Sequence, residues 1–191
     1  WDAALARDAA GRVGSLSEEI SWIESRRERV MDLWKLVEDG TLPSRVTHND
    51  TKISNFLFDS GDGSLLCAID LDTLMRSTVL NDVGDALRSY TNTGAEDDRD
   101  LSRVSMSREM YDAYMSGYLS VMEPYLTEAE KRYLPYSGCL ITFEQVLRFL
   151  MDYIDGDVYY KTSAPDHNLV RTRAQYQLLK SMEQQLAVPC L

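Results

Sequence analysis

The most constraining feature of the chain is a polar stretch at residues 47–55 that is followed at once by two short apolar segments. The stretch reads Thr-His-Asn-Asp-Thr-Lys-Ile-Ser-Asn, and the apolar segments, 56–58 and 65–69, flank a turn-rich run of Asp, Ser and Gly. Short apolar segments around an Asp/Gly turn predict a β-hairpin. Because an antiparallel pairing returns its outer ends to one place, Asn55 and Asp70 should lie at the same end of the hairpin.

Three residues of the stretch have the spacing His-x-Asp-x-x-x-x-Asn, which is that of kinase catalytic loops: His48, Asp50 and Asn55. In such a loop the Asp accepts or orients a substrate hydroxyl, and the Asn holds a metal ion. Asn55 and Asp70 offer hard oxygen ligands, which suit Mg²⁺ at the phosphates of ATP better than a soft metal. His48 is expected to brace the loop rather than to titrate.

Each of these residues also has a structural interpretation. A lone Asp in a loop is usually a turn or cap residue. The five-residue step to Asn55, the hairpin and the acid at its far end together favour the catalytic interpretation. Asp72 is either a further acid beside the metal or a structural cap, and it ranks below Asp70. His167 has no partner at a metal-ligand spacing, so a structural role is expected.

The composition describes one ordinary globular domain, with 191 residues of which 44% are hydrophobic and 27% charged. The net charge of -11 argues against a nucleic-acid partner, because phosphate binding requires clustered Lys and Arg. No apolar run reaches membrane-spanning length, so no membrane partner is expected. The three cysteines, Cys67, Cys139 and Cys190, predict neither a disulfide framework nor a metal motif and favour a cytoplasmic location. Cys67 is expected in the core.

Helical patterns dominate the rest of the chain. Apolar residues at three- and four-residue steps from Ile20 to Val37, behind a capping-box spacing at Ser15 and Glu18, predict one long helix that ends at Gly40. A second capping box occupies 127–130. Further helices are expected over residues 106–121, 138–153, with Glu144 and Arg148 embedded, and about 168–186. The expected fold class is mainly α with a small β-hairpin.

Several motifs resemble one known superfamily. The run from His48 to Asn55, the pair Ile69-Asp70 and the segment 82–85 look like the aminoglycoside phosphotransferase and choline kinase superfamily, whose members have a protein-kinase-like fold (α+β). The amino-acid sequences of several longer segments are most similar to those of the N-acetylhexosamine 1-kinase group. These segments are residues 48–52, 69–73, 84–88, 148–153, 156–161 and 165–171. The similarity covers nearly the whole chain. Its motifs are strong for a kinase and less specific for the sugar.

The resemblance implies roles for individual residues. Asp50 would be the catalytic base, and Asn55 and Asp70 would ligate Mg²⁺. Asp85 would hold the catalytic loop by accepting backbone hydrogen bonds. The implied reaction transfers the γ-phosphate of ATP to a sugar hydroxyl, the anomeric hydroxyl of an N-acetylhexosamine.

Two further positions match residues that contact the sugar in the hexosamine kinases, Arg148 and Tyr159. Structural alternatives stay open for both of them. Arg148 has Asp152 one helical turn away as a possible ion-pair partner. Tyr159 could simply belong to the core.

A kinase of this type also needs a glycine-rich loop over the phosphates and a Lys–Glu pair. Gly11 and Gly14 do not form such a loop, and the resemblance implies that the family's N-terminal lobe lies upstream of Trp1. The chain is therefore expected to be a single C-terminal lobe over 1–191 of a longer protein, inactive by itself. Its parts would be lead-in helices (1–46), the catalytic loop, hairpin and metal-binding segment (47–90), and a helical substrate-side subdomain (91–191).

Two other functions stay open. A kinase for another small alcohol, such as an aminoglycoside or a choline-like compound, would need an acidic pocket for its cationic acceptor. The acidic loop Glu96-Asp97-Asp98 offers one. A non-catalytic helical interaction module is the third possibility, and the joint presence of Asp50, Asn55 and Asp70 argues against it.

Overall fold

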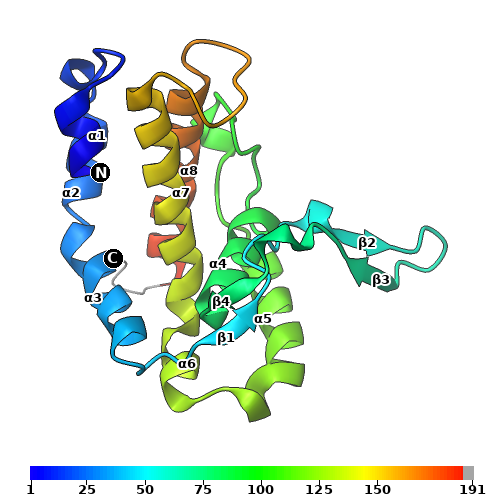
Figure 1. Ribbon diagram of the computed structural model, residues 1–191. Helices are drawn as coiled ribbons and strands as arrows, with labels where there is room; N and C mark the ends of the chain where they lie inside the picture. Colours follow the sequence, from blue (N-terminus) through cyan, green and yellow to red (C-terminus); the bar gives the residue numbers. More distant parts are fainter. Residues whose placement is uncertain (187–191) are drawn as a thin grey trace.

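The computed structural model describes residues 1–186, and helices dominate it (Figure 1). The helices α7 (Ser137–Asp155) and α8 (His167–Leu186) pack along each other at the centre, and α4 (Val79–Tyr90) packs against α7. The remaining helices are α1 (Asp2–Arg7), α2 (Ser17–Glu24), α3 (Arg27–Glu38), α5 (Arg108–Met122) and α6 (Glu128–Tyr133). The mainly helical fold expected for a kinase-like C-terminal lobe is confirmed.

Four short strands form two antiparallel pairs. Strand β2 (Phe56–Phe58) pairs with β3 (Leu65–Ala68), and this is the predicted hairpin, which projects away from the helices in Figure 1. Strand β1 (Arg45–Thr47) pairs with β4 (Met75–Ser77). The second pair was not predicted, because its strands are very short and lie on either side of the whole hairpin segment. It closes the base of the segment that carries the predicted catalytic loop.

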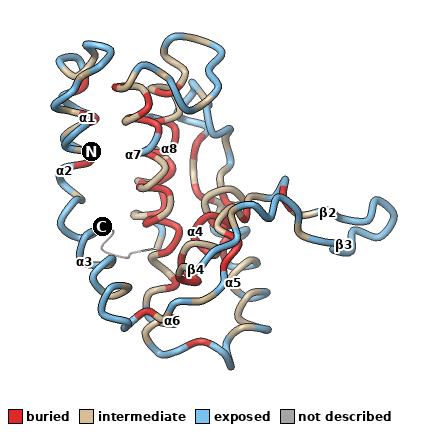
Figure 2. The backbone as a smooth tube through the Cα atoms, viewed as in Figure 1, coloured by how far each residue is buried: buried red, intermediate tan, exposed pale blue. Residues whose placement is uncertain are grey.

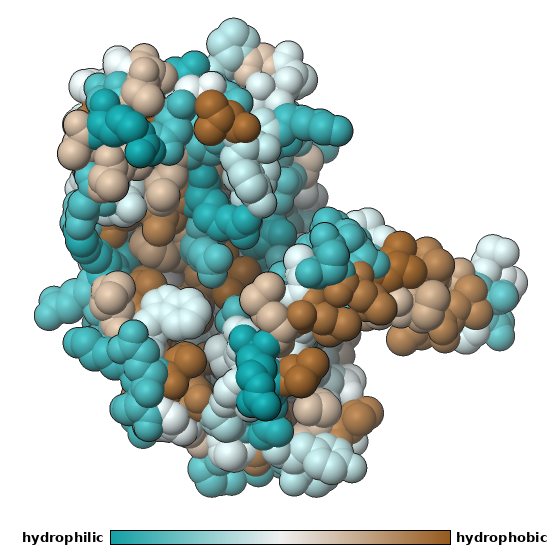
Figure 3. All heavy atoms as spheres, viewed as in Figure 1, coloured by the Kyte–Doolittle hydropathy of each residue, from teal (hydrophilic) through white to brown (hydrophobic). Residues whose placement is uncertain are grey.

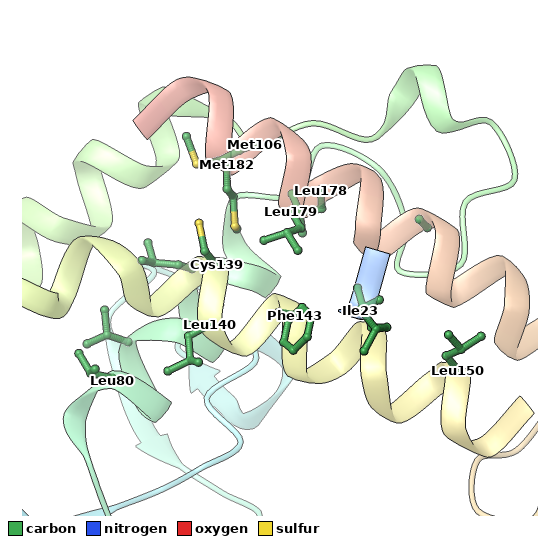
Figure 4. Packing of buried hydrophobic residues seen from close by; sticks show 14 of the residues in the cluster. Ile23, Leu80, Met106, Cys139, Leu140, Phe143, Leu150, Leu178, Leu179 and Met182 are labelled. Atoms are coloured by element: carbon green, nitrogen blue, oxygen red, sulfur yellow. The ribbon is translucent and has the colours of Figure 1, made fainter. Parts of the chain in front are cut away.

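The core lies between α4, α7 and α8, where the buried residues of Figure 2 face one another. Figure 4 shows the side chains that fill this space, among them Leu80, Cys139, Leu140, Leu178 and Met182. Leu80, Cys139 and Leu178 are fully buried. Complete burial of an aliphatic side chain stabilises a protein by about 1.5–3 kcal/mol. The three helices therefore share one packed core.

Gly84 allows α4 and α7 to approach closely. A Cβ atom at this position would overlap the carbonyl oxygen of Ser137 and the side chain of Ile141. We expect Gly84→Ala to lower the free energy of unfolding by about 1–3 kcal/mol, although Ala favours helix, because a backbone oxygen cannot move without shifting α7. Urea unfolding measures the change.

The matched control is Gly117→Ala in α5, where a Cβ atom would meet no other atom within 4 Å. This variant should be neutral or more stable by about 1 kcal/mol, which is the helix propensity difference. Equal changes in the two variants would contradict the close packing of α4 on α7.

The long N-terminal helix was predicted wrongly. The structure has two helices, because α2 ends at Glu24 and α3 begins at Arg27. Between them Arg26 donates hydrogen bonds to Glu183 of α8 at 3.0 and 2.9 Å. The capping box at Ser15 is also absent, since this hydroxyl donates to the carbonyl of Arg12 and α2 starts two residues later. The ion pair joins positions far apart in sequence, so local periodicity could not reveal the break.

The capping box at 127–130 is present, and it does more than start a helix. Thr127 Oγ1 accepts the N–H of Glu130, and Glu130 Oε2 accepts the N–H of Thr127 at 2.7 Å. The same buried carboxylate accepts two hydrogen bonds from Arg45, at 2.6 and 2.7 Å. Because Arg45 lies in β1, Glu130 fixes the strand that leads into the predicted catalytic loop.

Two of the three cysteines lie in the described part of the chain. Cys139 is buried in α7, as a core residue would be, but Cys67 is exposed on β3. The prediction that Cys67 lies in the core was wrong, because successive hairpin residues such as Leu65 and Leu66 are exposed on both faces. Cys190 lies outside the described residues. Of the helices within 1–186, none has the length and apolar character that crossing a membrane requires.

Candidate active site

The predicted catalytic loop is held by Asp82, which lies in the first turn of α4. One carboxylate oxygen accepts the N–H of His48 at 3.0 Å and the other accepts the N–H of Asn49 at 2.7 Å. The hydroxyl of Thr51 donates to the carbonyl of Asp82 at 2.6 Å. We expected Asp85 to accept these backbone bonds, but Asp85 lies one turn further along α4 and pairs with Arg88. Asp82 therefore performs the role predicted for Asp85.

A strained backbone turn precedes the predicted base. Asn49 has a left-handed conformation with φ of 62°, which Asn tolerates better than most residues. Its side-chain amide donates to the carbonyls of Thr47 and Thr73, at 3.2 and 3.0 Å. His48 places Nε2 at 2.9 Å from the carbonyl oxygen of Ile69. These contacts tie the loop to both ends of the hairpin segment.

Asp50 is oriented through one of its two carboxylate oxygens. Lys52 Nζ and Asn55 Nδ2 both donate to Asp50 Oδ2, each at 2.8 Å. The hydrogen bond to Asp50 raises the pKa of Lys52, so this side chain stays cationic. Within residues 1–186, Asp50 Oδ1 receives no hydrogen bond. The geometry thus leaves one carboxylate oxygen free to accept a proton.

Asn55 and Asp70 lie together at the base of the hairpin, where the spacing predicted them. The N–H of Ile69 donates to the carbonyl of Asn55 at 2.9 Å, next to the paired residues Phe56 and Ala68. Asp70 follows with a left-handed backbone, φ 63°. The hairpin therefore brings the two predicted metal ligands to one end, next to the catalytic loop.

The atoms available there suit a hard cation. The side-chain nitrogen of Asn55 is occupied by the carbonyl and the carboxylate of Asp50, and its Oδ1 has no hydrogen-bond partner among residues 1–186. The carboxylate of Asp70 is exposed and forms no ion pair with any of residues 1–186. Amide and carboxylate oxygens are the ligands that Mg²⁺ accepts in proteins, usually together with substrate phosphates. No cluster of three or more His, Cys, Asp or Glu that could hold a metal occurs in the described residues.

Asp72 and His167, the other two residues considered from the sequence, do not join Asp50, Asn55 and Asp70. Asp72 is exposed in the turn Leu71–Thr73. His167 has structural partners, because Ser163 donates its N–H to Nδ1 at 3.0 Å and Asp97 lies 2.8 Å from Nε2.

A cleft of about 800 Å³ opens beside Asp50. It is bounded by the catalytic loop, β4, α4, α7 and the segment that follows α7. Its lining includes the predicted residues Asp50, Asp85, Arg148 and Tyr159, whereas Asn55 and Asp70 lie outside the lining. The structure thus brings the predicted base and the predicted sugar contacts, which are far apart in sequence, to one cavity.

The structural alternatives for Arg148 and Tyr159 do not hold. Arg148 forms no ion pair with Asp152, and its guanidinium lies 6.0 Å from the ring centroid of Tyr159 and 5.9 Å from that of Tyr160. Tyr159 is 72% exposed, so it is not a core residue. Both side chains are therefore available to a molecule in the cleft.

Asp152 folds the segment that carries Tyr159. Its Oδ1 accepts the N–H groups of Val158 and Tyr159, at 3.0 and 2.8 Å, and its Oδ2 accepts the N–H of Tyr160 at 3.0 Å. The amide of Asn168 donates to Oδ2 at 2.8 Å. Sequence reasoning considered Asp152 only as a partner of Arg148, although a buried acid before a Gly-Asp turn is a detectable signal.

We expect Asp152→Asn to lower the free energy of unfolding by about 1–3 kcal/mol, because charge-assisted bonds to the backbone amides of residues 158–160 are lost. Amide hydrogen exchange at residues 158–160 should become faster, and this is the measurement that locates the effect. The control is Asp155→Asn in the same helix, whose exposed pair with Arg7 should contribute less than about 1 kcal/mol. Unchanged exchange at 158–160 would contradict the role of Asp152.

Lys52 and Glu144 are among the cleft residues that had no predicted role. Lys52 follows Asp50 by two positions, so its place in the motif was a signal for a functional cation. Glu144 was visible as an acid in an otherwise apolar helix, where charged groups are rare.

A helical lobe that joins a His-x-Asp loop, an Asn and an Asp at the base of a hairpin, and an adjoining cleft has the parts of a kinase-type phosphotransferase. Comparison with known families agrees: residues 1–125 match the model of the phosphotransferase enzyme family, APH, and the chain belongs to this family. The matched region contains Asp50, Asn55 and Asp70. It ends before Arg148 and Tyr159, so the family match does not extend to these two cleft residues.

Proposed function

We propose that this chain is the catalytic and acceptor-binding lobe of an ATP-dependent sugar kinase, with Asp50 as base and Mg²⁺ held by Asn55 and Asp70. The acceptor would be the anomeric hydroxyl of an N-acetylhexosamine. The observation that carries the proposal is the orientation of Asp50, whose Oδ2 is bound by Lys52 and Asn55 while Oδ1 stays free beside the cleft.

In the proposed reaction the acceptor oxygen attacks the γ-phosphorus of ATP and forms a new P–O bond. The bond from this phosphorus to the β,γ-bridging oxygen breaks, and ADP leaves. The hydroxyl proton passes to Asp50 Oδ1 and from there to solvent. Mg²⁺, when bound through Asn55 Oδ1 and Asp70, would neutralise phosphate charge, and Lys52 adds positive charge beside the acceptor.

The charges around the cleft favour a neutral acceptor over a polycationic one. The acids of the loop at 96–98 already have partners in the chain: Glu96 with Arg88 at 2.8 Å, Asp97 with His167 at 2.8 Å and Asp98 with Arg103 at 3.5 Å. The cation Arg148 has no ion-pair partner among residues 1–186. An aminoglycoside would therefore meet an unpaired guanidinium, and the acids of the loop at 96–98 would not be free to bind it. A sugar can use the exposed ring of Tyr159 as an apolar surface with a polar end.

The proposal includes an N-terminal lobe, as the resemblance implies, and the domain boundaries at 46 and 90 stay predictions. Support comes from the hairpin, where Figure 3 shows apolar side chains gathered on the surface. Leu65 and Leu66 are 59% and 60% exposed. Extended apolar surfaces on proteins usually mark interaction sites. A cytoplasmic location, where ATP is available, is part of the same proposal.

The test is an ADP-release screen of the full-length protein against N-acetylhexosamines, plain hexoses, aminoglycosides and choline. We expect the highest kcat/KM with an N-acetylhexosamine, and ³¹P NMR should identify a sugar 1-phosphate. Turnover of aminoglycosides or choline alone would favour a kinase for another alcohol. Failure of the full-length protein to bind Mg-ATP would favour the interaction module.

A further inference from the structure

The cleft contains a carboxylate oxygen that the fold leaves without a hydrogen bond. Asp85 is 7% exposed, and its Oδ1 accepts two bonds from Arg88, at 3.1 and 2.9 Å. The other oxygen, Oδ2, is buried and has no partner among the described residues. Unpaired buried carboxylate oxygens are costly and rare in native structures. Because Asp85 lines the cleft, a molecule bound there is one source of a donor for this oxygen.

Arg88 cannot readily supply that donor, because its other groups are occupied. Its Nη1 donates to Glu96 at 2.8 Å and lies 3.4 Å from Oε1 of Gln175. Arg88 is thus held between α4, α8 and the loop at residue 96. Rotating the guanidinium toward Asp85 Oδ2 would break these contacts. The contacts of Arg88 with Glu96 and Gln175 therefore leave Asp85 Oδ2 without a donor among residues 1–186.

A second carboxylate faces the same cleft from α7. Glu144 lines the cavity and has neither a hydrogen bond nor an ion pair with residues 1–186. Burial raises the pKa of Glu144, and the charge of Asp85 adds to this rise, which is consistent with two acids near each other. Arg148, one turn along α7, opposes the rise by its positive charge.

Asp85 also lies close to the reactive end of the cleft. Its charge contributes to the raised pKa of Lys52, the residue that orients Asp50. Asp50, Lys52, Asp85, Glu144 and Arg148 all line this one cavity. A molecule that offers one hydroxyl to Asp50 would place its neighbouring groups beside the two carboxylates.

We propose that Asp85 and Glu144 bind the acceptor by accepting hydrogen bonds from its hydroxyl and amide N–H groups. This inference rests on the proposed function for the identity of the acceptor. It explains the unpaired oxygen of Asp85, because an O–H or N–H donor would complete its coordination. A site of this kind discriminates strongly against analogues that lack the donor.

The test measures binding, so it does not depend on turnover. N-acetylglucosamine is titrated calorimetrically into the full-length protein, wild type and the variants Asp85→Asn and Glu144→Gln. We expect the Kd to rise about tenfold to a hundredfold in each variant, which is the range for one lost charge-assisted hydrogen bond. The control is Glu109→Gln on the exposed face of α5, which should bind like wild type. A deoxy sugar that lacks the hydroxyl bound by one of these carboxylates should have the same Kd for wild type and for the variant of that carboxylate.

The outcomes separate the two proposals. If wild type binds the sugar and both variants bind it equally well, Asp85 and Glu144 do not recognise the acceptor, and the proposed function is unaffected. If the protein phosphorylates an aminoglycoside or choline instead, the proposed sugar is wrong, and the same variants titrated with that acceptor decide the inference. Absence of binding to every acceptor would overturn both. Glu144→Gln is expected to fold like wild type, because the Glu144 side chain has no hydrogen bond or ion pair with residues 1–186 that the substitution would remove.

Discussion

Replacement of Asp50 by Asn is expected to lower kcat by about 10²–10⁴-fold, the usual contribution of a positioned general base. Asn has nearly the same shape, and its amide oxygen can still accept hydrogen bonds from Lys52 and Asn55. The loop should therefore keep its conformation while the site loses the group that takes the hydroxyl proton. ADP release by the full-length protein measures kcat, and calorimetry measures the melting temperature.

The control for this prediction is Asp112→Asn, which removes an exposed acid on α5 that pairs with Arg108 at 2.9 Å. Such a surface pair contributes little to stability, so activity and melting temperature should match wild type. The Asp50 variant should also melt near the wild-type temperature and bind Mg-ATP normally. Retention of kcat within tenfold of wild type would show that Asp50 is not the base.

The catalytic loop and the hairpin were predictable because their signals are local. The His-x-Asp-x-x-x-x-Asn spacing lies within nine residues, and the Asp/Gly turn determines which residues return to the base of the hairpin. Asn55 and Asp70 could therefore be placed together without knowledge of the rest of the fold. The capping box at Thr127 was predictable for the same reason.

The residue that holds the loop was not predictable from the same signals. Asp82 and Asp85 lie one turn apart on α4, and both are acids that follow a helix start. Only the rotation of α4 relative to the loop decides which carboxylate meets the amides of His48 and Asn49. That rotation is set by packing against α7, where Gly84 permits close contact. The sequence pattern alone does not predict this rotation of α4.

The predicted acceptor contacts in the cleft show the same limit at longer range. Arg148 and Tyr159 were found by resemblance, but their structural alternatives were excluded only by contacts across the fold. Asp152 is unavailable to Arg148 because it binds the backbone of residues 158–160. The unpaired oxygen of Asp85 is likewise a property of the folded arrangement.

The second large effect is expected for Asp82→Asn, although Asp82 does not line the cleft. The carboxylate accepts two backbone N–H groups, whereas an Asn side chain has one acceptor oxygen and would direct its NH₂ group at the other amide. The strained turn at Asn49 would then relax and move Asp50. A displacement of about 1 Å in a reacting group can cost about 10²-fold in rate, so kcat should fall by about that factor. Amide hydrogen exchange at residues 48 and 49 should become faster.

Asp85→Asn is the informative comparison, because it changes the same residue type one helical turn away. Asp85 contacts neither loop amide, so this variant should weaken acceptor binding and leave exchange at residues 48 and 49 unchanged. Asp82→Asn should do the reverse, with a lower kcat and nearly normal acceptor binding. If Asp85→Asn instead accelerated exchange at 48 and 49 while Asp82→Asn did not, the assignment drawn from the sequence would be right and the one drawn from the structure wrong. The pair of variants thus separates positioning of the base from recognition of the acceptor.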